Sequence, residues 1–190
     1  MKRNLYIDFD GVIFDTITYA FLEMKKLKID IKNNEMVTNY FKKVNWYYLI
    51  EMGGIINDSL KKIEILNNSL EFDLVSVLTH RCSYQEGVIK EANLMETIPD
   101  LKVITVPKKI AKHHAVLARN NILIDDDLKK ILGWIEDGGI GILFNQKVNT
   151  LIYPYELNQE QPYFITNDLL DILKVNEELK EKHYVKRKKA

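Results

Sequence analysis

Short apolar segments recur along this chain, and each one ends in polar or acidic residues and is followed by a helical pattern. Five such segments cover residues 5–9, 74–78, 103–106, 122–124 and 140–144. Strands that are buried on both faces of a parallel sheet have this continuous apolar character. From Tyr84 onward, the segments between them are long enough for crossover helices. We therefore predict an α/β fold with a Rossmann-like, doubly wound parallel sheet.

The segment between the first and second predicted strands is much longer than the others. It contains apolar residues at helical spacing, interrupted at Asn33-Asn34 and Asn67-Asn68. A single crossover helix does not need about 60 residues. We predict that residues 16–69 form a small helical cap, inserted after the first strand, and that residues 1–15 and 70–190 form the core.

Composition excludes several classes of protein. Lys plus Arg and Asp plus Glu both number 27, so no global field favours nucleic acid or a membrane as partner. Cys82 is the only cysteine, which excludes an intrachain disulfide and a zinc site made of several thiolates. The chain has no long apolar segment at its start or elsewhere, so we expect a cytoplasmic protein.

Two carboxylates, Asp8 and Asp10, lie two positions apart where the first predicted strand ends, and Gly11 lets the chain turn after them. Both should face the crevice beyond the strand ends, where open α/β sheets bind ligands. Two solvated loop aspartates are the plainer interpretation. A calcium loop is excluded because the glycine comes too early and the next ligand is missing.

A second acidic cluster, Asp125-Asp126-Asp127, also follows an apolar strand. Asp126 or Asp127 is suited to cap the helix that runs through Trp134. Carboxylates that converge at one sheet edge repel each other, and a hard divalent cation with oxygen ligands relieves that repulsion. We therefore expect Mg²⁺ at this edge, with Asp125 or Asp126 as a direct ligand.

Hydroxyl and ammonium groups complete the predicted edge. Thr79 and His80 end the second apolar segment, and Lys108, Lys109 and Lys112 follow the third. A hydroxyl and an ammonium are what a phosphoryl group with developing charge requires. His113 and His114 are adjacent on a predicted helix and should diverge by about 100 degrees, so we do not expect them to share a metal.

The order Asp8-x-Asp10, Thr79, a lysine within residues 108–112, and Asp125-Asp126 resembles the four motifs of the haloacid dehalogenase (HAD) superfamily. The shorter motifs around Asp8, Thr79 and Asp125, with residues 138–143, look like the bacterial and phage proteins grouped with 5'(3')-deoxyribonucleotidases. The resemblance spans the core from Leu5 to about Phe144.

This resemblance implies a role for each matched residue. Asp8 would attack phosphorus, and Asp10 would protonate the leaving oxygen and later activate water. Mg²⁺ would be held by Asp8, by the Asp10 carbonyl and by either Asp125 or Asp126. Thr79 and one lysine, with Lys112 favoured over Lys109 and Lys108, would bind phosphoryl oxygens. His80, Lys109 and Trp46 are further candidates for substrate binding, Trp46 as a surface for base stacking or as a packing residue.

The predicted function is a Mg²⁺-dependent phosphomonoester hydrolase with an aspartyl-phosphate intermediate, acting on (deoxy)nucleoside monophosphates as a 5'-nucleotidase. One alternative is a HAD phosphatase of another substrate class, such as sugar phosphates or polynucleotide ends. The other is a non-catalytic binding protein that kept the fold, although a binding protein does not need both Asp8 and Asp10.

Overall fold

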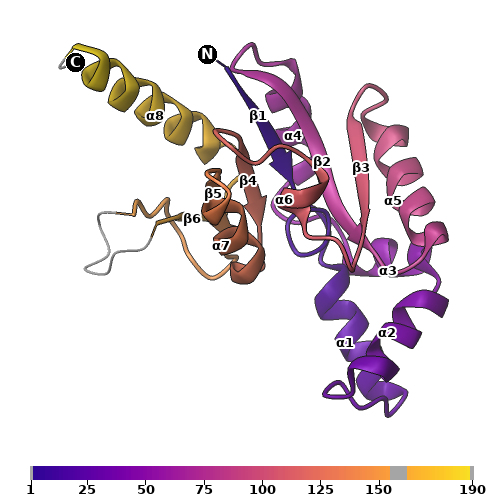
Figure 1. Cartoon of the computed structure of the whole chain (residues 1–190). Helices are drawn as coiled ribbons and strands as arrows, with labels where there is room; N and C mark the ends of the chain where they lie inside the picture. Colours follow the sequence, from indigo (N-terminus) through magenta and orange to yellow (C-terminus); the bar gives the residue numbers. More distant parts are fainter. Residues whose placement is uncertain (1, 155–161, 189–190) are drawn as a thin grey trace.

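The computed structural model describes residues 2–154 and 162–188, and within them the chain forms a six-stranded parallel sheet (Figure 1). The strands lie in the order β3-β2-β1-β4-β5-β6. In chain order they are β1 (Arg3–Ile7), β2 (Phe72–Arg81), β3 (Lys102–Pro107), β4 (Ile122–Asp125), β5 (Ile140–Phe144) and β6 (Phe164–Thr166). The predicted α/β fold is confirmed, and β6 is a strand that the sequence did not predict.

Eight helices connect and cover these strands in the described part of the chain. They are α1 (Thr16–Lys26), α2 (Asn34–Lys43), α3 (Trp46–Gly53), α4 (Ser59–Asn68), α5 (Tyr84–Thr97), α6 (Lys112–Ala115), α7 (Leu128–Glu136) and α8 (Asp171–Lys188). None of them combines the length and the apolar character that crossing a bilayer requires.

The first four helices occupy the long segment between β1 and β2. Helices α1 and α2 lie beyond the carboxyl ends of β1 and β2 (Figure 1). Helix α4 instead packs against β2, with Ile63 and Leu66 fully buried. The division into a cap and a core at residue 69 stays a prediction.

Successive side chains of the central strands point to opposite faces of the sheet, and both faces are apolar. This explains why these strands have continuous apolar sequences. In β1, Leu5 and Ile7 pack into one hydrophobic cluster, and Tyr6 packs into another together with Leu123 and Trp134. Both faces of the sheet are therefore covered, as expected for strands flanked by helices on each side.

The chain order of the strands places the carboxyl ends of β1 and β4 side by side. From β1 the chain runs outward through β2 to β3, and then returns to place β4 on the other side of β1. Leu5 pairs with Ile122, and Ile7 pairs with Ile124. Asp8, which follows β1, thus lies next to Asp125, the last residue of β4. This reversal of strand order is where open α/β sheets form their binding crevice.

The buried side chain of Asn121 joins the amino ends of these two strands. Its Oδ1 accepts a hydrogen bond from the Asn4 N–H (2.8 Å), and its Nδ2 donates to the Leu117 carbonyl (2.9 Å).

Asn121→Ala leaves both backbone groups unpaired, so we expect the free energy of unfolding to fall by about 1 to 3 kcal/mol in urea denaturation. Asn68→Ala, at the exposed end of α4, is the control. An equal loss in both variants would contradict this role of Asn121.

Candidate active site

The loop after β1 holds Asp8 at the sheet edge and turns the chain sharply. The Asp8 N–H extends the strand pairing by donating to the Ile124 carbonyl (2.9 Å), and the Asp8 Oδ1 accepts from the Phe9 N–H (2.8 Å). Gly11 has a φ of +77°, a conformation that favours glycine. A Cβ at this position would lie 2.2 Å from Oδ2 of Asp126. The carboxylate of Asp126 is therefore packed directly on the Gly11 backbone.

Asp8 and Asp125 share two lysines in a buried cluster. Lys112 Nζ lies 2.8 Å from Oδ1 of Asp8 and 2.6 Å from Oδ2 of Asp125. Lys130 Nζ lies 2.9 Å from Oδ2 of Asp8 and 3.0 Å from Oδ1 of Asp125. Burial alone would raise the pKa of the Asp8 carboxyl, but the two ammonium groups outweigh it and hold that pKa well below its usual range. Asp8 is thus an anion over the whole physiological pH range.

The neighbouring aspartates behave differently. Burial, followed by the negative charge of Asp8, raises the pKa of Asp125 to about 6. Asp126 is largely exposed as a residue, but its carboxylate lies against the loop, where desolvation and then the charges of Asp8 and Asp125 raise its pKa to about 7. Carboxylate oxygens of Asp8, Asp125 and Asp126 all lie within 4.8 Å of one another. This all-oxygen, anionic donor set fits a hard divalent cation such as Mg²⁺.

Asp10 belongs to a second cluster, centred on Lys90 of α5. Lys90 Nζ donates to Oδ2 of Asp10 (2.5 Å) and to Oε1 of Glu86 (2.7 Å), and its side chain has no exposed surface. Thr16 donates from Oγ1 to the other oxygen of Asp10 (2.7 Å). Both oxygens of the Asp10 carboxylate are therefore held in place.

The same ammonium also contacts an aromatic side chain of α3. Lys90 Nζ lies 4.4 Å from the centroid of the Trp46 ring, within the range of a cation–π interaction. Burial of Lys90 by itself would lower its pKa, yet the carboxylates of Asp10 and Glu86 outweigh it and raise that pKa. Lys90 is therefore a permanently charged link between Asp10, α5 and α3.

A cleft of about 510 Å³ opens beside these two clusters. Its volume is in the range of sites for small ligands. Its apolar side chains come from α1, α2, α3 and the start of α7, and its charged side chains come from the sheet edge, α5 and α7. The lining residues are Asp10, Ile17, Phe41, Trp46, His80, Cys82, Glu86, Lys108, Asp126, Asp127, Leu128 and Lys130.

The three candidate lysines after β3 have different positions. Lys112 is buried between Asp8 and Asp125, and Lys108 lines the cleft. Lys109 is exposed and is not among the residues that line the cleft. Of the three, only Lys112 contacts Asp8.

The remaining candidates lie around the same edge. Thr79 is fully buried, and its hydroxyl donates to the His80 carbonyl (3.3 Å). His80 lines the cleft with its Nε2 2.9 Å from the Ile110 carbonyl oxygen, and burial lowers its pKa. Trp46 also lines the cleft but is only 3% exposed, because it stacks on Phe41 and lies under Lys90. The substrate-binding roles of all three stay predictions.

Sequence reasoning missed two lysines that contact the predicted aspartates. Lys130 lies in the first turn of α7, five residues after Asp125, and the order Asp125-Asp126-Asp127 followed by this lysine is the signal that could have found it. Lys90 follows Glu86 by four residues on α5, which resembles an ordinary surface pair. Only the tertiary structure shows that this pair is buried against Asp10.

The raised pKa of Asp126 predicts a defined dependence of stability on pH when no metal is present. The unfolded aspartate loses its proton near 3.8, whereas the folded one keeps it up to about 7, so folding loses stability as pH rises between these values. Asp126→Asn removes this loss. In the presence of a chelator, we expect the difference in melting temperature between the variant and wild type to increase from pH 4 to pH 7 and to stay constant above pH 7.

The exposed carboxylate of Asp100 provides the control, as Asp100→Asn. A difference between Asp126→Asn and wild type that stays constant from pH 4 to 8, or that shrinks as pH rises, would contradict the raised pKa.

Comparison with known proteins supports the fold. Neither a protein-family model nor a curated protein sequence matches this chain. Solved structures do match, among them a HAD-hydrolase from Bacillus subtilis bound to magnesium, at 14% identity and a TM-score of 0.57, covering 93% of this chain and 99% of that chain.

Two further matches have similar extents. A haloacid dehalogenase-like hydrolase from Streptococcus pneumoniae has 13% identity and a TM-score of 0.52, covering 92% of this chain and 98% of that chain. A D,D-heptose 1,7-bisphosphate phosphatase from Burkholderia thailandensis has 15% identity and a TM-score of 0.52, covering 90% of this chain and 99% of that chain. The chain therefore has the fold of HAD-superfamily hydrolases.

Proposed function

We propose that this protein is a Mg²⁺-dependent phosphomonoester hydrolase that works through an aspartyl-phosphate intermediate. The observation that carries the proposal is the state of Asp8. It is a buried carboxylate, kept anionic by Lys112 and Lys130, and both Lys130 and Asp10 line the neighbouring cleft. An anionic oxygen close to an acid–base group is what attack on a phosphate ester requires.

In the first step, an oxygen of Asp8 forms a bond to phosphorus as the bond between phosphorus and the ester oxygen breaks. Asp10, which takes up a proton from solvent as the substrate binds, passes that proton to the departing oxygen, so the product leaves as a neutral alcohol. The carboxylate that remains on Asp10 is stabilised by Lys90 and Thr16, which contact its two oxygens.

In the second step, water attacks phosphorus while Asp10 takes one of its protons. The bond between phosphorus and Asp8 breaks, inorganic phosphate leaves, and both aspartates return to their starting state. Lys112 remains against Asp8 and Asp125 in both steps, because it is fully buried and held by two carboxylates.

The carboxylates of Asp8, Asp125 and Asp126 would hold Mg²⁺, together with the Asp10 carbonyl. When bound, Mg²⁺ neutralises these carboxylates and withdraws charge from the phosphoryl oxygens. The magnesium-bound structure from Bacillus subtilis, which shares the fold, supports this choice of metal.

Lys130 must move before Asp8 can react. It lies on Oδ2 of Asp8, it is 24% exposed, and it lines the cleft, whereas Lys112 is buried on Oδ1. Lys130 is thus the counter-ion that an incoming cation or phosphate can displace. Once displaced into the cleft, its ammonium is in place to bind a phosphoryl oxygen.

For the substrate we propose a (deoxy)nucleoside monophosphate, which makes the protein a 5'-nucleotidase. The volume of the cleft suits a small phosphate ester. Its apolar side chains Ile17, Phe41 and Trp46 suit a flat base.

Asp8→Asn tests the covalent mechanism. We expect turnover to fall below about 1% of wild type, because the substitution removes the attacking oxygen and one metal charge together. Phosphate release with Mg²⁺ should be measured on nucleoside 5'-monophosphates, sugar phosphates and p-nitrophenyl phosphate. Asp73→Asn, at the opposite edge of the sheet, is the control. Full activity of folded Asp8→Asn would exclude this mechanism, and a preference for sugar phosphates would exclude the nucleotidase.

Lys130→Met tests the role of the displaceable lysine. Because the ammonium competes with Mg²⁺ for Asp8 and Asp125, we expect Mg²⁺ to bind about tenfold more tightly to the variant, as measured by titration calorimetry. Lys129→Met, the adjacent exposed lysine on α7, controls for the general change in charge. Affinity that is unchanged or weaker in Lys130→Met would show that the lysine does not compete.

A further inference from the structure

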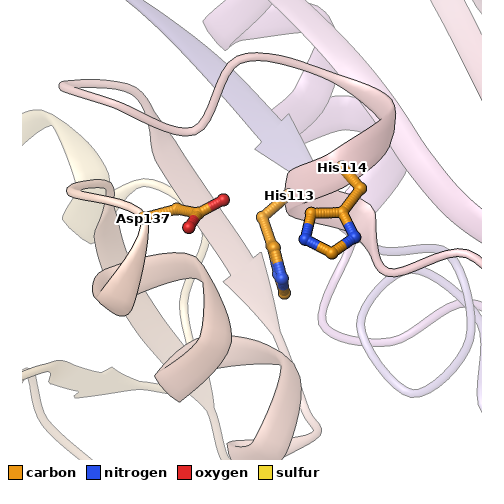
Figure 2. Close-up of side chains that lie close together, drawn as sticks. All are labelled: His113, His114 and Asp137. Atoms are coloured by element: carbon orange, nitrogen blue, oxygen red, sulfur yellow. The ribbon is translucent and has the colours of Figure 1, made fainter.

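A second group of potential metal ligands lies outside the cleft, where α6 packs against the end of α7. It consists of His113 and His114 on α6 and Asp137, which follows α7. One ligand atom from each of the three lies within 4.8 Å of the other two. Figure 2 shows the Asp137 carboxylate directed toward His113, with the ring of His114 beside that of His113. None of the three lines the cleft.

The two histidine rings are turned toward each other despite their adjacent positions. Their centroids are 4.4 Å apart and their planes meet at 78°. Helix α6 has only four residues, so the directions of its two histidine side chains are less restricted than they would be in a long helix. Among the described residues, these three side chains form no hydrogen bond or ion pair with other groups, so their nitrogen and oxygen atoms are available to a ligand.

Helix α7 is shaped to receive His113. Gly133 lies within α7, and a Cβ at that position would be 2.8 Å from Cε1 of His113. Glycine is less favourable than alanine inside a helix, and here it makes room for the imidazole. Asp137 is also the C-cap residue of α7, where the helix dipole favours a cation.

We propose a second cation site, formed by His113, His114 and Asp137. It is separate from the Mg²⁺ site and selective for transition-metal ions such as Zn²⁺. Two imidazoles and one carboxylate are borderline donors that suit Zn²⁺, Ni²⁺ or Cu²⁺, whereas Mg²⁺ prefers oxygen ligands alone. We expect small rotations of the exposed His114 and Asp137 side chains to bring the three donors to bonding distance of one ion, with water as the remaining ligand.

A cation at this site would connect two helices that act on Asp8. Helix α6 begins with Lys112, and α7 contains Lys130, the two lysines that contact Asp8 and Asp125. Bound Zn²⁺ would fix α6 to the end of α7 and so restrict the relative movement of these lysines.

The test is titration of the tag-free full chain with Zn²⁺ in excess Mg²⁺, followed by calorimetry and by the melting temperature. We expect one Zn²⁺ per chain, and a melting temperature that rises on binding. His114→Gln and Asp137→Asn should each weaken binding by about tenfold or more, since each removes a direct ligand. Gly133→Ala keeps all three donors but pushes His113 away, and it should weaken binding as well.

Two control variants should bind Zn²⁺ as wild type does. Glu136→Gln removes the neighbouring carboxylate of α7, and Cys82→Ser removes the only thiol. The site would be excluded if wild type bound no Zn²⁺ under these conditions. It would equally be excluded if folded His114→Gln, Asp137→Asn and Gly133→Ala all kept wild-type affinity.

Discussion

The cluster of two carboxylates and two ammonium groups at the ends of β1 and β4 is the interaction on which the rest of the site depends. Asp8 and Asp125 are almost completely buried, and a buried carboxylate is strongly unfavourable unless a cation compensates it. Lys112 and Lys130 supply that compensation from α6 and α7. The sheet edge and these two helices must therefore be positioned together, since the loss of either partner leaves an unpaired charge inside the protein.

The same principle applies to Asp10, with different elements. Lys90 carries its charge from α5 into a fully buried position, where Asp10, Glu86 and the ring of Trp46 all contact it. The two aspartates of the proposed reaction thus have separate counter-ions. The counter-ion of Asp10 is enclosed, whereas one of the two counter-ions of Asp8 is open to the cleft. This difference suits an acid–base group that stays in place and a nucleophile that must be uncovered.

Much of the fold and part of the site could be predicted from sequence, because both follow from local rules. Continuous apolar segments predict buried parallel strands, and carboxyl ends of such strands share one edge, which brings Asp8 and Asp125 together. The contacts of side chains on helices are harder to predict, because they depend on how each helix is rotated about its axis against the sheet. Lys130 and Lys90 were missed for that reason. The three-residue β6 is too short for a periodic pattern, and the facing rings of His113 and His114 depend on side-chain rotation within one turn.

The contact between Gly11 and Asp126 limits which substitutions the chain can accept at these two positions. The two residues are far apart in the chain, yet the carboxylate of one occupies the space that any side chain at the other would need. A mutation at position 11 is therefore not a local event, because it displaces a carboxylate of the proposed metal site and strains a backbone conformation that favours glycine. A homologous chain with a side chain at position 11 should therefore also differ at position 126.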